Sequence, residues 1–203
     1  MEHTVNQITV CGTLRELPEF SHENHGKRFY RFSLDIPRLS GATDTLPVIA
    51  SEAVINAFDL SGGEMLTVTG QIRSHNNRTN GVRHLLIFIF ASSIVAEDSQ
   101  PQNEVVLTGL LCKEPIFRRT PLGREICDVM LAVPRAFRRA DYLPCILWGR
   151  TAQEISRCHI RDQISIHGRL QSRVYTKLTE DGPEERTAYE ISALSAEILD
   201  DMT

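Results

Sequence analysis

Three aromatic side chains in the second half of the chain stand among arginines. Phe137 lies in PRAFRRADY, Trp148 in YLPCILWGRTAQEI and Tyr175 in SRVYTK. Flat rings interleaved with cations can bind unpaired nucleic acid, because bases stack on the rings while the cations follow the phosphates. Core packing is the alternative interpretation for Trp148, which is the single tryptophan and ends an apolar run. An ordinary exposed hairpin position is the alternative for Tyr175.

The cations around these rings complete the pattern. A single charged residue most often only solvates a surface, so it is the concentration of cations around three rings that favours binding. Arg124 and Arg169 belong to the same basic stretch. The candidate nucleic-acid-binding residues are Phe137, Trp148, Tyr175, Arg118, Arg119, Arg135, Arg138, Arg139, Arg150, Arg173 and Lys177.

Catalytic and metal-binding patterns are weak. The acidic residues and histidines do not fall into a triad or metal-ligand spacing, and the sequence has no glycine-rich phosphate-binding loop. The cysteines lack C-x-x-C spacing, and four of the five lie in apolar stretches, where a thiol behaves as a small hydrophobic group. We therefore expect no enzymatic activity, no metal and no cofactor.

Charge and hydropathy narrow the class of protein. The 203 residues carry a formal charge of −4, so the chain is not a polycation that binds nucleic acid through bulk charge, although a local basic stripe is compatible with this value. No apolar run reaches the length of a membrane span, and the N-terminal MEHTVNQITV lacks the pattern of a secretory signal. We expect a cytoplasmic protein that does not bind a membrane.

The chain is one unit written twice. NQITVCGTLRELPEF, which starts at Asn6, aligns with NEVVLTGLLCKEPIF, which starts at Asn103. Gly12 and Gly109 keep this offset of 97, as do FSLDIPR and VMLAVPR further along. The polar EDSQPQ between the copies is typical of a domain boundary. We predict an N-terminal domain over residues 1–98 and a C-terminal domain over residues 103–203.

Each copy is predicted to be mostly β-structure. Runs such as QITVCGTL and MLTVTGQIR have the β-branched, alternating character of strands, and their glycines suit strongly bent strands. A short helix is expected between the third and fourth strands, over Ser51–Phe58 in the first copy and Thr151–Cys158 in the second. Thr151 and Glu154 are predicted to form a capping box, and Ser51 to cap the other helix. Five strands with this helix predict an all-β chain of two tandem OB-fold barrels, although periodicity alone does not exclude another small β-barrel.

The second copy resembles the DNA-binding domain of bacterial single-stranded DNA-binding proteins. The resemblance rests on the order and spacing of NEVVLTGLLCKEP, the glycine of TPLGREI, LAVPR, YLPCILWGRTAQEI, HGRLQSRVY and RTAYEI, and it covers Asn103 to Leu199. The first copy matches more weakly. The resemblance implies an OB fold that coats single-stranded DNA in replication, recombination or repair without chemistry. It also implies that Phe137, Trp148 and Tyr175 are stacking positions, and that two chains form a homodimer with four barrels.

The sequence departs from this family in two ways. The first copy lacks the three rings, since Ser40 stands opposite Phe137 and Asn77 is roughly opposite Tyr175. We therefore expect it to be mainly architectural, with weaker DNA contact, and its doubly apolar strand HLLIFIFASSIV to form an interface. Family members typically end in an acidic recruiting tail, which EILDDMT does not resemble. The chain is therefore expected to be either a bacterial nucleoid-associated protein or one encoded by a phage or mobile element, and the latter would suit the missing tail.

Two questions stay open at this level. Nothing in the sequence identifies a probe for the ribose hydroxyl, so RNA is an alternative partner to DNA. An OB module of a primosome-like or assembly complex, with the rings facing a partner protein, is the alternative function, because OB folds host many functions. The interleaving of arginines with the rings favours nucleic acid.

Overall fold

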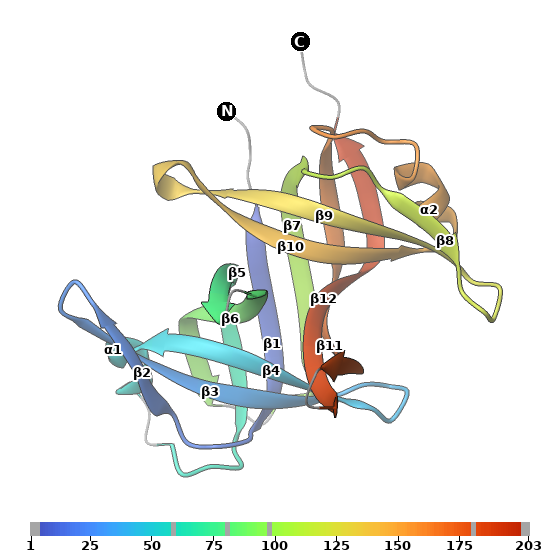
Figure 1. Ribbon diagram of the computed structural model, residues 1–203. Helices are drawn as coiled ribbons and strands as arrows, with labels where there is room; N and C mark the ends of the chain where they lie inside the picture. The colour runs from blue at the N-terminus through green and yellow to red at the C-terminus, as the bar shows by residue number, and fades with distance from the viewer. Residues whose placement is uncertain (1–4, 58–59, 80–81, 97–98, 180–181, 200–203) are drawn as a thin grey trace.

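The computed structural model describes residues 5–57, 60–79, 82–96, 99–179 and 182–199, without the side chains of residues 78–79, 82–83 and 179 (Figure 1). The first copy forms β1 (Asn6–Leu14), β2 (Glu19–Asn24), β3 (Lys27–Pro37), β4 (Thr43–Ser51), α1 (Glu52–Ile55), β5 (Met65–Thr79) and β6 (Val82–Ala96). The second forms β7 (Gln102–Leu111), β8 (Ile116–Arg119), β9 (Glu125–Arg135), a 3₁₀ turn (Ala136–Arg138), β10 (Arg139–Trp148), α2 (Gly149–Ile155), β11 (Gln163–Thr179) and β12 (Gly182–Leu199).

Each copy closes into a five-stranded barrel. In the first copy, β1 pairs with β3 and β5, β3 with β4, and β5 with β6, all antiparallel, while β4 and β6 close the ring in parallel. The second copy repeats the scheme with β7, β9, β10, β11 and β12. This strand order is that of the OB fold, which confirms the predicted fold class. Short β2 and β8 are additions to the five predicted strands, and each extends a barrel at its edge.

Two glycines at equivalent positions of the repeat allow the barrels to bend. A Cβ at Gly70 would lie 2.2 Å from the carbonyl oxygen of Phe90, and one at Gly168 would lie 2.4 Å from that of Ser192. The pairing register shifts at both glycines, where Ser92 of β6 and Leu194 of β12 have no opposite residue, which marks a β-bulge in the fifth strand of each barrel. Only glycine allows the fifth strand to approach the fourth so closely at these bulges.

The helices lie where they are expected, but their caps differ from the prediction. α2 begins at Gly149, which has a φ of 55°, and no side chain caps it. Glu154 instead accepts a hydrogen bond from Arg150 Nε at 2.8 Å, so the Thr151–Glu154 capping box is wrong. Ser51 occupies the N-cap position of α1 without a side-chain hydrogen bond.

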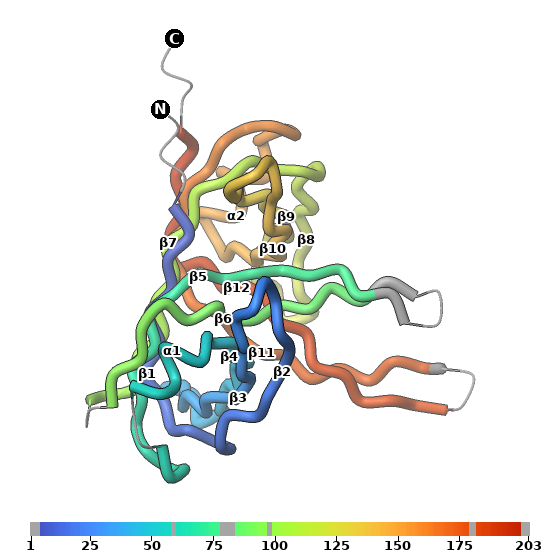
Figure 2. The backbone as a smooth tube through the Cα atoms, turned by 90° about the vertical axis from the view of Figure 1, so that its left-hand side faces the viewer, coloured from blue at the N-terminus to red at the C-terminus, as the bar shows by residue number. Residues whose placement is uncertain are grey.

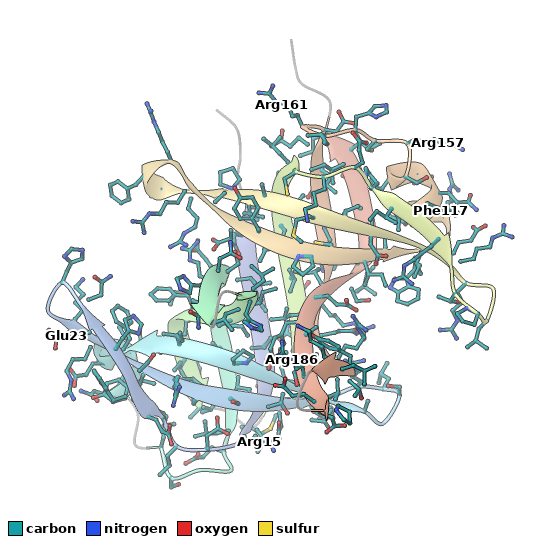
Figure 3. All side chains as sticks on the ribbon, in the orientation of Figure 1. Arg15, Glu23, Phe117, Arg157, Arg161 and Arg186 are labelled. Carbon is teal, nitrogen blue, oxygen red and sulfur yellow. The ribbon has the colours of Figure 1, made fainter. Side chains whose placement is uncertain are left out.

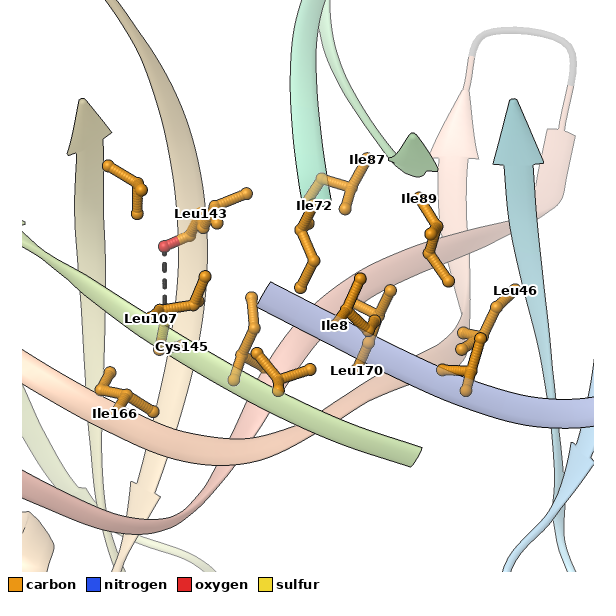
Figure 4. Packing of buried hydrophobic residues seen from close by; sticks show 14 of the residues in the cluster. Ile8, Leu46, Ile72, Ile87, Ile89, Leu107, Leu143, Cys145, Ile166 and Leu170 are labelled. Atoms are coloured by element: carbon orange, nitrogen blue, oxygen red, sulfur yellow. Dashed lines mark hydrogen bonds between the residues drawn. The ribbon is translucent and has the colours of Figure 1, made fainter. Parts of the chain in front are cut away.

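One pair of strands joins the two barrels. β1 and β7 run antiparallel from Asn6 opposite Leu107 to Cys11 opposite Gln102, and they merge the strands of both copies into one sheet (Figure 1). The buried hydrophobic residues accordingly form a contiguous cluster in which Ile8 and Ile72 of one barrel continue into Leu107 and Ile166 of the other (Figure 4). The division at 1–98 and 103–203 stays a prediction, and its outermost ends fall outside the described residues.

Two buried carboxylates fasten the barrels to each other reciprocally. Asp44 of the first barrel accepts a hydrogen bond from the backbone N–H of Ser172 in the second, at 2.6 Å. Asp141 of the second accepts one from the N–H of Ser74 in the first, at 2.8 Å. Asp44 also binds Arg38 (Nε to Oδ2, 2.7 Å). Asp141 pairs with two arginines, Arg73 at 2.9 Å and Arg135 at 3.3 Å.

Asp141→Asn should lower the free energy of unfolding by about 3 kcal/mol, at the lower end of the range for breaking a buried ion pair, because both guanidinium groups are partly exposed. Urea unfolding measures the change. Asp128→Asn is the matched control, since Asp128 pairs with Arg118 at the surface and should contribute about 1 kcal/mol or less. Equal losses for the two variants would show that Asp141 does not fasten the barrels.

Candidate nucleic-acid interface

The outer face of β10 organises the predicted site. Tyr142 and Trp148 are exposed on this face, where Ile146 between them is covered, while Asp141, Leu143 and Leu147 point to the opposite face and are fully buried. The alternation arises because successive side chains of a strand point to opposite faces. The strand therefore presents Tyr142 and Trp148 on one surface.

Trp148 lies at the end of this strand, 37% exposed. Its indole Nε1–H donates to Ser192 Oγ at 3.1 Å, which fixes the plane of the ring. The ring borders an open hollow of about 580 Å³, whose other walls include Arg169 and, from the first barrel, Leu39. Trp148 is thus neither sealed in the core nor free to rotate.

Phe137 lies at the other end of β10, in the turn that connects it to β9. The ring is 94% exposed. Phe137 and Arg138 both have left-handed backbone conformations, with φ of 61° and 53°. Such conformations are uncommon for large side chains. Both residues occupy the turn between β9 and β10, at the end of a hairpin that projects from the barrel (Figure 1).

Tyr175 belongs to the β11–β12 hairpin and lines a groove that the β5–β6 hairpin also lines. The β5–β6 hairpin of the first barrel and the β11–β12 hairpin of the second project in the same direction (Figure 2). Tyr175 is 37% exposed in an open groove of about 680 Å³, which Leu86 and Pro144 also line. The guanidinium carbon of Arg173 lies 5.7 Å from the centre of the Tyr175 ring, a cation–π contact.

The three predicted rings are spread over one barrel. Phe137 and Trp148 flank the two ends of β10, which is about 30 Å long at 3.3 Å per residue. Tyr175 lies beside Pro144 near the middle of the strand. A ligand that touched all three would have to be an extended chain.

The predicted cations fall into two groups. Arg118, Arg119, Arg135 and Arg150 pair with Asp128, Glu125, Asp141 and Glu154, so their charges are largely balanced. Arg118 and Arg119 lie on β8, near Phe117 and far from the β9–β10 turn (Figure 3). Within the described residues, Arg138, Arg139, Arg173 and Lys177 form no ion pair. The same holds for Arg124, which lines the Trp148 hollow.

Sequence reasoning missed Tyr142. Its ring is 43% exposed, and its backbone N–H donates to Ser74 Oγ of the first barrel at 2.7 Å. Its spacing of six from Trp148 could have indicated it, since residues an even number apart share one face of a strand. Arg169, which the sequence placed in the basic stretch, lines the Trp148 hollow, and its Nε is buried without a hydrogen-bond partner among the described residues.

The cysteines behave as core residues. Burial raises the pKa of Cys127 to about 11 and raises that of Cys145 further, so both thiols stay protonated near neutral pH. In the described ranges, no three His, Cys, Asp or Glu side chains are grouped to hold a metal ion. No helix in that part of the chain has the length and apolar character to cross a membrane.

Comparison with known proteins places the chain in a family. The single-strand binding protein family profile matches residues 102–199. Single-stranded DNA-binding protein B of Bacillus subtilis is 38% identical over 80 residues, which are 36% of this chain and 71% of that protein. The chain belongs to the single-strand binding protein family. Proteins of this family bind DNA and are not enzymes. Membership in the family confirms the expectation that this chain is not an enzyme.

The family profile covers only the second copy, and the relatives match over different lengths. The single-stranded DNA-binding protein of Bacillus cereus is 33% identical over 107 residues, 48% of this chain and 60% of its own length, so the chain spans less than two thirds of that relative. Wild-type single-stranded DNA-binding protein from Thermus aquaticus superposes on 98% of this chain with a TM-score of 0.81, over 95% of its own length. At 21% identity, that likeness shows the shared two-barrel fold alone.

Proposed function

We propose that this protein binds single-stranded DNA without sequence preference, along the outer face of β10. Bases stack on Phe137, Tyr175 and Trp148, and cations beside the rings contact phosphates. Tyr142 belongs to the same surface. The relatives named as single-stranded DNA-binding proteins support this function for the second copy, where the family match lies.

The observation that carries the proposal is the exposure of three separate rings, Phe137 and Trp148 at the two ends of β10 and Tyr175 of β11 beside its middle. A protein interface would ordinarily bury its aromatic anchors together near its centre. Rings spaced along about 30 Å, with cations between them, suit an extended polyanion instead. The primosome-like alternative has no comparable observation in its favour.

The cellular role follows from this binding. A protein that coats unpaired DNA protects it during replication, recombination or repair, and we infer such a role in the bacterial cytoplasm. The same chemistry admits single-stranded RNA, because none of the described groups beside the rings is specific for deoxyribose. The DNA assignment rests on the family.

Oligo-dT should quench the fluorescence of Trp148, the single tryptophan, at low salt because a stacked base quenches indole. Phe137→Ala should then weaken the affinity about tenfold, the effect of losing one stacked base, without unfolding the barrel. Phe20→Ala is the control, since Phe20 is exposed on the first barrel away from this face. Absence of quenching would favour a protein partner.

The affinity should fall with rising salt. Among the described residues, five exposed cations around the rings form no ion pair (Arg124, Arg138, Arg139, Arg173 and Lys177). If each contacts one phosphate, log affinity against log salt should have a slope of about −3.5, at −0.7 per contact. The double variant Arg138→Gln, Arg139→Gln should reduce the slope to about −2.1.

A matched control uses two arginines that lie elsewhere on the second barrel, Arg157 and Arg161 (Figure 3). Their double replacement by glutamine should leave the slope unchanged. A wild-type slope near zero would exclude the proposed groove.

We also propose that two chains associate, which would bring four barrels together. Light scattering should then give a mass near twice the 22.9 kDa of one chain, with and without a bound oligonucleotide. A mass of one chain in both cases would contradict the dimer and leave the binding surface of the single chain as proposed.

A further inference from the structure

Four aromatic rings lie together on the outer surface of the first barrel, at positions other than those of the second barrel. His22 and Phe29 stack with ring centres 4.9 Å apart and planes 12° apart. Phe90 lies next to them, 5.9 Å from Phe29. Phe88 precedes Phe90 by two residues on β6 and points to the same face, because Ile87 and Ile89, which alternate with them, are buried in the core.

A bulge in β2 creates this arrangement. The pairing of β2 with β3 shifts at Ser21, so that Phe20 is opposite Tyr30 while His22 is opposite Phe29. Adjacent residues of β3 point to opposite faces. The bulge therefore turns His22 onto the face of Phe29 and leaves Phe20 on the other face, where Arg28 lies over its ring.

The four rings line a hollow of about 260 Å³, together with Asn24, Ile49, Arg73 and Arg135; we call these eight residues the aromatic hollow. The volume is below the roughly 300–1,000 Å³ typical of sites for larger organic ligands, which suits a single planar group. Asn24 and His22 supply polar groups that could meet the edge of such a ring. The apolar outer face of β6, which the sequence predicted to form an interface, lines this aromatic hollow through Phe88 and Phe90.

The charge of the hollow favours an anionic ligand. Arg73 comes from the first barrel and Arg135 from the second, and both share the single buried carboxylate of Asp141. Two cations on one anion leave an excess positive charge. No described residue that lines the hollow is acidic. At the equivalent place near Asp44, Gln171 stands where Arg73 would be expected from the repeat, and the single Arg38 balances the carboxylate.

The hollow also continues the proposed path of DNA. Arg135 directly precedes the turn that presents Phe137 and Arg138. The β9–β10 hairpin and the β2–β3 hairpin project from the same side of the molecule in both views (Figures 1 and 2). A strand that leaves Phe137 toward the first barrel thus meets Arg135 and the rings behind it.

We propose that the aromatic hollow is a second binding site for an unpaired base, which extends the single strand from the second barrel onto the first. The site rests on the proposed function, since it continues that path. A base stacks against Phe29 and Phe90, and the phosphate beside it contacts Arg73 and Arg135. The first copy then binds the single strand itself and is not only architectural.

Binding of oligo-dT to the full chain, read by Trp148 fluorescence, tests the site. Phe29→Leu with Phe90→Leu keeps apolar volume in the hollow but removes the flat faces. With an oligonucleotide of about 35 nucleotides, which exceeds the roughly 4–16 that one barrel covers, the affinity should fall about tenfold. With about 8 nucleotides it should not change, because a strand held on Trp148 does not need the hollow.

Phe20→Leu is the matched control, because it makes the same change on the opposite face of the same ribbon and should leave both affinities unchanged. If the double variant is less stable in urea, His22→Ala is used instead, because His22 is exposed. Its affinity for the long oligonucleotide should fall about threefold, and its affinity for the short one should not change. If the hollow variant binds the long oligonucleotide as tightly as Phe20→Leu does, this site is overturned. Quenching of Trp148 in the same experiment would still support binding by the second barrel. Loss of quenching at every length in the wild-type chain would instead overturn the proposed function.

Discussion

The antiparallel pairing of β1 with β7 is the constraint on which the rest of the structure depends. The backbone groups along the free side of β1 pair with those of β7, so neither copy presents an open strand there. It also sets the rotation between the copies, which brings Ser172 within reach of Asp44 and Ser74 within reach of Asp141. Because these carboxylates are buried, their hydrogen bonds permit one arrangement of the barrels and penalise others.

That arrangement decides which surfaces are composite. The hollow beside Trp148 includes Leu39 of the first barrel, and the groove beside Tyr175 includes Leu86. The aromatic hollow of the first barrel in turn includes Arg135 of the second. Each copy therefore completes a depression on the other, and neither barrel alone would present the same surface to a nucleic acid.

The two copies share their interiors and differ on their outer faces. Gly70 and Gly168 meet the same steric demand at the same bulge, because any barrel with this strand order must bend there. The outer faces are under no such demand. Rings stand at the end and the turn of β10 in the second barrel, at Trp148 and Phe137, but on β3 and β6 in the first, at Phe29 and Phe90.

The sequence by itself determined the duplication, the two barrels, their helices and the exposure of Phe137, because strand periodicity, glycine spacing and a polar surrounding are local properties. It did not determine the cap of α2, since Glu154 is equally able to bind Arg150, nor that Asp141 neutralises part of the charge of Arg135. Those outcomes depend on residues far apart in the chain or on competition between neighbours. Only the tertiary structure, by pairing β1 with β7, decided which rings and cations share a surface.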